Sequence, residues 1–253
     1  MGSLVGKRAL VTAGGQGIGK AIAEELLRAG CDVVAHYFSD EKGALDVVEL
    51  AKSLGRRAIC LQADLSCEND AIALVKQAAD FLGGLDVLVN NAGGLVARRT
   101  LSQVDLSFWQ KVIDINMTSM MLVSREAVPY LARSGGASIV NISSLAGRKG
   151  GHGGSLVYSM TKGAVLTFTR ALAAELGALG VRVNAVAPGL ILGTSFHNTH
   201  TTKESAEETI RGIPLARAGD VYDIARPVVF LASEYDGFIT GATLDINGGV
   251  YCA

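Results

Sequence analysis

The sequence predicts an α/β fold: one domain, residues 1–253, in which a doubly wound parallel sheet of about seven strands has helices on both faces. Short β-branched and apolar runs alternate along the chain with longer stretches whose apolar residues recur at helical spacing. The 253 residues are 49% hydrophobic and contain 31 glycines, so one sizeable core can form. No Pro/Ser-rich linker divides the chain.

The elements follow from these patterns in order. We predict strands at 8–12, 32–37, 58–62, 87–90, 138–142, 182–186 and 243–246. Apolar residues recur at helical spacing in five stretches, which we predict to be helices: 19–29, 68–82, 108–131, 158–176 and 221–232. Residues 193–217 are rich in Thr, His and Glu and have weak periodicity, which predicts a long loop of the kind that often covers a substrate as a lid.

Composition narrows the class of partner. Lysine and arginine number 23 against 24 aspartates and glutamates, so the net charge of -1 excludes a strong basic field for nucleic acid or anionic membranes. The first residues have no long apolar block, and the four cysteines have no C-x-x-C spacing. We therefore expect a cytoplasmic protein with buried, reduced thiols, no bound metal and a small-molecule partner.

A glycine-rich turn follows the first predicted strand, where residues 12–19 read T-A-G-G-Q-G-I-G. Glycines at this place let the backbone approach a pyrophosphate at the start of a helix. The usual dinucleotide pattern G-x-G-x-x-G is incomplete, because Ile22 stands where a third glycine would follow Gly17 and Gly19. From these residues alone, a tight turn that only serves packing stays an alternative.

The turn resembles the T-G-x-x-x-G-x-G segment of the classical short-chain dehydrogenase/reductase family, with Ala13 in place of the first glycine. The resemblance extends over nearly the whole chain. It includes Asp64 after the third strand, N-N-A-G at 90–93, Asn116, Ser144, Tyr158-x-x-x-Lys162 and Pro188-Gly189. It implies a Rossmann-type sheet and an NAD(P)-dependent oxidoreductase that interconverts CH–OH and C=O groups.

The resemblance assigns four catalytic roles. Tyr158 would exchange a proton with the substrate oxygen, and Ser144 would orient the substrate carbonyl. Lys162, on the same helix face at i+4, would lower the pKa of the tyrosine and bind the nicotinamide ribose. Asn116 would anchor a water that links Lys162 to solvent. An isolated tyrosine and lysine at this spacing would usually lie on a solvated face, so the assignment depends on the whole set of motifs.

The resemblance also implies which residues contact the cofactor, with Asp64 accepting a hydrogen bond from the adenine amino group. They are Gly14, Gln16, Gly17, Ile18, Gly19, Tyr37, Phe38, Ser39, Asp64, Leu65, Asn91, Ala92, Gly93, Tyr158, Lys162, Pro188, Gly189 and Thr194. Thr194 stands one position later than the threonine of relatives, whose place holds Gly193.

The residues that would surround the adenosine ribose bear on the choice between NAD(H) and NADP(H). The usual acidic ribose ligand is replaced by Tyr37, while Gln16, Phe38 and Ser39 supply no cation for a 2'-phosphate. Asp40 lies nearby, and Lys42 is the only base close by. This pattern favours NAD(H) slightly and leaves dual use open.

Polar residues in adjoining segments predict the substrate class. Gly94, Arg148, His152 and His197 are the candidate substrate contacts, with Arg98, Arg99, Lys149 and His200 close by in the sequence. They favour a small polyhydroxylated or acidic carbonyl compound, such as a sugar, a polyol or a uronate-derived keto sugar acid, whose carboxylate Arg148 would bind. The alternative is that these charged residues lie on the solvated surface and bind no substrate.

Two other functions stay open. A 3-oxoacyl-[acyl-carrier-protein] reductase would share every catalytic motif, although the positions of its carrier-docking bases hold Gly135 and Leu179 here, with Arg133 and Arg182 nearby. A non-catalytic dinucleotide-sensing module would share the fold. The resemblance further implies a homotetramer that pairs the helices at 108–131 and 158–176, with the C-terminal strand forming a second contact.

Overall fold

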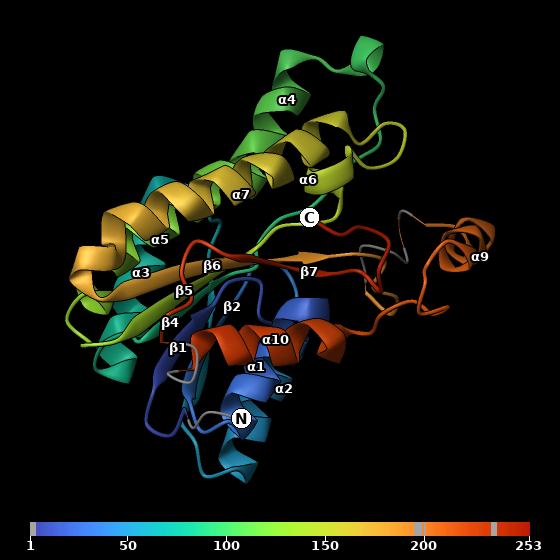
Figure 1. Cartoon of the computed structure of the whole chain (residues 1–253). Coiled ribbons are helices and arrows are strands. Elements are labelled where there is room, and N and C mark those ends of the chain that lie inside the picture. The colour runs from blue at the N-terminus through green and yellow to red at the C-terminus, as the bar shows by residue number, and fades with distance from the viewer. Residues whose placement is uncertain (1–3, 195–198, 200, 234–236) are drawn as a thin grey trace.

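A computed structural model describes residues 4–194, 199, 201–233 and 237–253. Seven parallel strands form one sheet in the order β3-β2-β1-β4-β5-β6-β7 (Figure 1). The strands are β1 (Arg8–Val11), β2 (Asp32–Tyr37), β3 (Ala58–Gln62), β4 (Val87–Asn90), β5 (Ala137–Ile142), β6 (Val181–Pro188) and β7 (Thr243–Ile246). Strand order reverses beside β1, between the two halves of the sheet, and this is where a doubly wound sheet opens a crevice for a ligand.

Helices cover both faces of this sheet. They are α1 (Gly17–Arg28), α2 (Glu41–Ser53), α3 (Glu68–Leu82), α4 (Leu106–Ile113), α5 (Ser119–Leu131), α6 (Ala146–Lys149), α7 (Leu156–Leu176), α9 (Lys203–Arg211) and α10 (Val221–Ala232). Helices α1, α2 and α10 lie on one face, and α3, α5 and α7 lie on the other (Figure 1). The predicted doubly wound α/β fold is confirmed.

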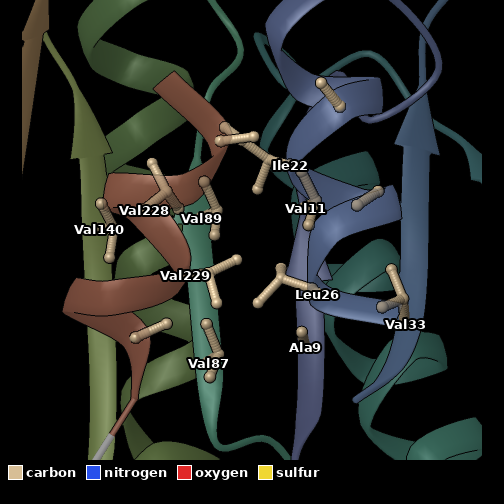
Figure 2. Packing of buried hydrophobic residues seen from close by; sticks show 14 of the residues in the cluster. Ala9, Val11, Ile22, Leu26, Val33, Val87, Val89, Val140, Val228 and Val229 are labelled. Carbon is tan, nitrogen blue, oxygen red and sulfur yellow. The ribbon is translucent and has the colours of Figure 1, made fainter. Parts of the chain in front are cut away.

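The inner strands are largely apolar because both of their faces are buried, whereas β3 and β7 at the two edges of the sheet are only partly buried. Ala9 and Val11 of β1 point into the core beneath α1 and α10, whereas Leu10 points into the core beneath α3 and α5. Figure 2 shows Leu26 of α1 and Val229 of α10 above neighbouring strands. Each fully buried side chain of this size contributes roughly 1.5–3 kcal/mol relative to exposure, so the alternation fixes the register of the strands.

Several elements differ from the prediction, and the short helix α6 is one that was not expected. The expected helix at 108–131 is α4 and α5 joined by a π-helical turn, η2 (Asp114–Thr118), in which the Asn116 Nδ2 donates to the Val112 carbonyl over 2.9 Å. Helix α2 was not predicted, although Asp40 caps its N-terminus by accepting from Gly43 N. The expected loop at 193–217 contains α9, whose N-terminus is capped by Thr202.

The expectation of buried thiols is wrong for Cys67 and Cys252, which are exposed. Cys31 is buried, and its burial raises the pKa of the thiol to about 12. All four cysteines are free. Across the described part of the chain, no helix combines the length and the apolar character needed to cross a membrane.

Candidate active site

The glycine turn leads from β1 into α1 at the centre of the sheet. Gln16 precedes α1 without a side-chain cap, and the first helical turn has no acidic residue, so its N–H groups and the helix dipole favour an anion there. A side chain at Gly19 would bring its Cβ to 2.1 Å from the Ala13 carbonyl oxygen and 2.4 Å from the Asn91 Nδ2. The turn therefore has the form of a phosphate-binding loop, which fits a dinucleotide.

Ala13, which replaces the first glycine of the family pattern, has a left-handed backbone with φ of 49°. Two side chains hold it there. Its N–H donates to the His36 Nδ1 over 3.0 Å, and its carbonyl accepts from the Asn91 Nδ2 over 3.2 Å. The His36 Nε2 lies 3.0 Å from the Ala63 carbonyl, so the neutral tautomer with a proton on Nε2 satisfies both partners. Sequence reasoning missed His36, which occupies an otherwise apolar strand.

His36 predicts a pH dependence of stability. Its burial lowers the pKa of the imidazole, so the unfolded chain takes up a proton near the ordinary value of about 6.5 while the folded chain does not. The free energy of unfolding should therefore fall as the pH drops from 7 towards 5. His36→Asn keeps an acceptor for Ala13 but cannot titrate. In urea unfolding at several pH values, the variant should lose less stability over this range; equal losses would contradict the assignment.

The turn after β4 is joined to the glycine turn by hydrogen bonds. The Thr12 Oγ1 accepts from the backbone N–H groups of Asn91 and Ala92, both over 2.9 Å. Gly93 lies so close to the reaction centre that a Cβ there would be 2.7 Å from the Asn116 Oδ1 and 3.0 Å from the Lys162 Nζ. The turn thus fixes the cofactor loop and the buried lysine relative to each other.

Ser144, Tyr158 and Lys162 come together where β5 ends and α7 begins. The Lys162 Nζ is buried and donates to the Ile142 carbonyl over 2.9 Å. The Ser143 hydroxyl donates to the Lys162 backbone carbonyl over 2.7 Å, whereas the Ser144 hydroxyl is hydrogen-bonded to the Tyr158 phenol. This difference favours Ser144 over Ser143 as the residue that faces a substrate carbonyl.

Burial governs the protonation of both reactive groups. It raises the pKa of Tyr158, which the hydrogen bond from Ser144 partly offsets, and it lowers the pKa of Lys162 to about 8. The lysine Nζ lies 5.9 Å from the centre of the Tyr158 ring. Near neutral pH the phenol is therefore protonated beside an ammonium group, a state that can donate a proton to an adjacent oxygen.

These residues open into a cavity of about 370 Å³. Among the predicted residues, Gln16, Gly17, Ile18, Gly19, Asn91, Gly93, Ser144, Tyr158, Lys162, Pro188, Gly189, Thr194 and His152 line it. Thr194 lies against the glycine turn, because a Cβ added at Gly17 would be 3.5 Å from the Thr194 Cγ2. The cavity therefore connects the dinucleotide loop directly with the proton-donating tyrosine.

Other predicted residues lie outside the lining of this cavity: Gly14, Tyr37, Phe38, Ser39, Asp64, Leu65, Ala92, Gly94, Asn116 and Arg148. The Asp64 Oδ1 accepts from the Ser66 Oγ over 2.6 Å, and Leu65 is buried in the core. The pKa of Tyr37 is raised by burial and by the adjacent Glu41 carboxylate. Glu41 is also hydrogen-bonded to Tyr37. An acidic group thus stands beside the position expected for the adenosine ribose.

The carboxylate-binding role predicted for Arg148 needs correction. Its Nε and Nη2 donate to the Asp245 carboxylate over 3.0 and 2.9 Å, and both side chains are 14% exposed. The guanidinium is thereby committed to a structural ion pair between α6 and β7. His197 and His200 lie outside the described residues. The sequence placed Arg98 and Lys149 only near the candidate substrate contacts, and it did not single out Ser155, Thr201, Ser205 or Thr209, although all six line the cavity.

Comparisons with known proteins agree with this geometry. The family model described as Enoyl-(Acyl carrier protein) reductase matches residues 12–251. The chain is 38% identical over 245 residues to the 3-oxoacyl-[acyl-carrier-protein] reductase FabG of Staphylococcus aureus, covering 97% of this chain and 98% of that protein. It is 36% identical over 249 residues to glucose 1-dehydrogenase 2 of Bacillus subtilis, with 98% and 95% covered.

Solved structures of similar sequence share the fold throughout. Carveol dehydrogenase from Mycobacterium avium in complex with NAD superimposes with a TM-score of 0.91 at 29% identity, covering 99% of each chain. A short-chain dehydrogenase from Burkholderia cenocepacia in complex with NADP gives 0.91 at 33%, covering 98% of each. The NADH-dependent reductase A1-R' responsible for alginate metabolism gives 0.90 at 32%, covering 99% of each.

The match extends over almost the entire chain and includes the sheet, the glycine turn and the tyrosine–lysine pair. The chain therefore belongs to the classical short-chain dehydrogenase/reductase family, whose members are NAD(P)-dependent oxidoreductases that act on CH–OH and C=O groups.

Proposed function

We propose that this enzyme interconverts a carbonyl and an alcohol on a small, polar compound of the sugar, polyol or keto sugar acid class. The observation that carries the proposal is the cavity itself. Its lining includes Tyr158 and three hydroxyl-bearing residues on the side of α9, Thr201, Ser205 and Thr209, together with apolar residues such as Leu190 and Ile191. Hydroxyl-bearing residues along a cavity can exchange hydrogen bonds with a polyhydroxylated ligand.

The chain's own residues supply the proton chemistry. The bound nicotinamide would supply or accept the hydride at the substrate carbon. In the reducing direction, the protonated Tyr158 phenol donates its proton to the substrate oxygen, and Ser144 holds that oxygen in line. The Lys162 ammonium, with a pKa of about 8, stabilises the resulting phenolate. In the oxidising direction, the same phenolate accepts the proton of the alcohol.

For the cofactor we propose NAD(H), with NADP(H) as the weaker alternative. Glu41 is hydrogen-bonded to Tyr37 at the expected ribose position, and Asp40 caps α2 beside it. Both carboxylates would repel the additional phosphate of NADP(H), and Lys42 is the only base adjacent to them in the sequence. Solved relatives bind either NAD or NADP, so both dinucleotides fit this fold.

A fluorescence titration with NADH and NADPH, followed by turnover assays, tests cofactor and substrate together. We expect tighter binding of NADH and oxidation of NADH with keto sugars, uronates or polyol-derived ketones. Glu41→Gln should improve the binding of NADPH relative to NADH, whereas Glu49→Gln, farther along the same helix, should not. Failure to bind either dinucleotide at micromolar concentration would contradict the proposal. Strong NADPH preference would overturn the choice of cofactor.

A carrier-linked 3-oxoacyl substrate is the second candidate, because the S. aureus relative carries that name. One observation weighs against it. Arg182, one of the two bases near the expected carrier-docking positions, donates to the Leu231 and Ser233 carbonyls at the end of α10, over 3.0 and 2.9 Å. Its guanidinium already stabilises a helix end. Faster turnover of 3-oxoacyl carrier protein than of free sugars or keto acids would establish this alternative.

We further propose a cytoplasmic homotetramer in carbohydrate metabolism, with a lid formed by residues 193–217. Leu156 and Met160, 43% and 38% exposed, present one apolar edge of α7 that suits self-association. Four free cysteines suit a reducing compartment. Size-exclusion chromatography with light scattering would measure the assembly, and a monomer would contradict this part of the proposal.

A further inference from the structure

The cavity has a one-sided distribution of charge. Three cations line it, namely Arg98, Lys149 and Lys162, together with His152. Within the described ranges, 4–194, 199, 201–233 and 237–253, no aspartate or glutamate belongs to this lining. Since the net charge of the whole chain is -1, the positive cavity is a local feature. Such a site attracts anions and disfavours cationic ligands.

Two adjacent residues of α6 have different roles. Arg148 is ion-paired to Asp245 and lies over the Tyr251 ring, 5.7 Å from its centre. Lys149 lines the cavity, and its ammonium makes no ion pair with any residue that the structure describes. Its backbone N–H donates to the Leu145 carbonyl over 3.0 Å, which fixes its place one turn after the Ser144 segment.

Contacts on two sides of α6 fix the position of the Lys149 backbone. A Cβ on Gly147 would lie 2.5 Å from the Lys162 backbone carbon, so α6 packs directly on the backbone of α7. The Arg148–Asp245 ion pair fastens the other side of α6 to β7. Lys149 is exposed, but its backbone belongs to a firmly packed element that follows the Ser144 segment, the arrangement that a selective binding residue needs.

On the side of α9 the described lining residues are uncharged and bear hydroxyl groups, whereas residues such as Leu190 and Ile191 make other parts of the lining apolar. Ser205 and Thr209 stand one turn apart on this helix and line the cavity with Thr201. An anionic group near Lys149 and hydroxyl groups near α9 would be accommodated at the same time. The hydroxyl-bearing residues do not distinguish a sugar acid from a neutral sugar, whereas the cationic residues do.

We propose that Lys149 binds an anionic group of the substrate, a carboxylate or a phosphate ester, and so makes the enzyme selective for hydroxylated acids over neutral sugars. This inference rests on the proposed function and names its specificity-determining residue. An ammonium group acts as a point charge, so it binds either anion without demanding a bidentate geometry. Arg98 adds positive charge to the same cavity, and Arg148 does not take part.

Binding to the NAD⁺-loaded enzyme, measured by calorimetry, tests the inference with four probes: D-glucuronate, D-glucuronamide, D-glucose 6-phosphate and D-glucose. Because Lys149 is exposed, we expect the anionic probes to bind about 5- to 10-fold more tightly than the neutral ones. Preference for glucuronate identifies the carboxylate as the source of the charge, and preference for the phosphate identifies the ester. Lys149→Met should remove the preference, and Lys149→Glu should reverse it.

Lys76→Met, which removes another exposed lysine, on α3, should leave the preference unchanged. An enzyme without preference for an anion, or a Lys149→Met variant that keeps it, overturns the inference. The proposed function fails separately, through absence of NADH oxidation with every carbonyl compound in the turnover panel. Turnover of neutral sugars without anion preference would overturn only the role of Lys149.

Discussion

Replacing Tyr158 with phenylalanine is expected to lower kcat by about 10²- to 10⁴-fold, the usual contribution of a positioned acid or base. The substitution removes the phenolic proton and the hydrogen bond with Ser144, and it keeps the ring that packs in the cavity. Cofactor affinity should change little, because the glycine turn and Lys162 are untouched. Steady-state rates with the best substrate and a fluorescence titration with NADH measure the two effects separately.

Tyr130→Phe is the matched control, since it removes the same hydroxyl from α5 at a place outside the cavity lining. It should keep nearly all activity. A Tyr158→Phe variant with more than a tenth of the original turnover would assign the proton transfer to another group. Complete absence of turnover in the unmodified protein, with NADH still bound, would instead favour a dinucleotide-sensing module.

Replacing Lys162 with methionine is expected to have opposite effects on activity and stability. Burial lowers the pKa of this lysine from 10.5 to about 8, which means that keeping it charged near neutral pH destabilises the folded state. A pKa shift of this size corresponds to roughly 3 kcal/mol of unfolding free energy, which the variant gains because it has no buried charge. Loss of the hydrogen bond to the Ile142 carbonyl lowers this gain by about 1 kcal/mol. We therefore expect a variant that is about 1–3 kcal/mol more stable and has lost most of its kcat.

The pH dependence gives this prediction a second measurement. Between pH 8 and the ordinary lysine pKa of 10.5, the folded protein releases a proton that the unfolded chain still holds. Stability of the original protein should accordingly rise with pH in this window relative to that of Lys162→Met. Urea unfolding of both proteins at pH 7, 8.5 and 10 measures the difference. A constant difference would contradict a strongly lowered pKa.

Most of the fold was accessible from local patterns. The strands β2, β3, β4 and β7 have the predicted ends, since a buried parallel strand is a short apolar run between turns. Helix α2 was missed although Ala44, Val47 and Ala51 bury one face of it. The mean hydropathy of α2 is low, and its first turn contains Gly43. A Cβ added at Gly43 would lie 1.9 Å from the Gly15 carbonyl oxygen. That glycine serves a contact between distant segments.

The reactive residues could be predicted because the family resemblance assigns them position by position, but their neighbours could not. Which of Arg148 and Lys149 faces the cavity depends on Asp245, 97 residues farther along the chain. The function of His36 depends on Ala13 and Ala63, which belong to two other segments. Spacing along one element cannot reveal such contacts, because they arise only when the sheet is assembled.

The ion pair between Arg148 and Asp245 also has a consequence for biosynthesis. The ribosome makes β7 last among the strands, 97 residues after Arg148. At about 5–20 residues per second, the nascent chain spends roughly 5–20 seconds with Arg148 made and α6 without its anchor. We expect a chain truncated before β7 to lack an ordered site, so that translation stopped early yields no active oxidoreductase.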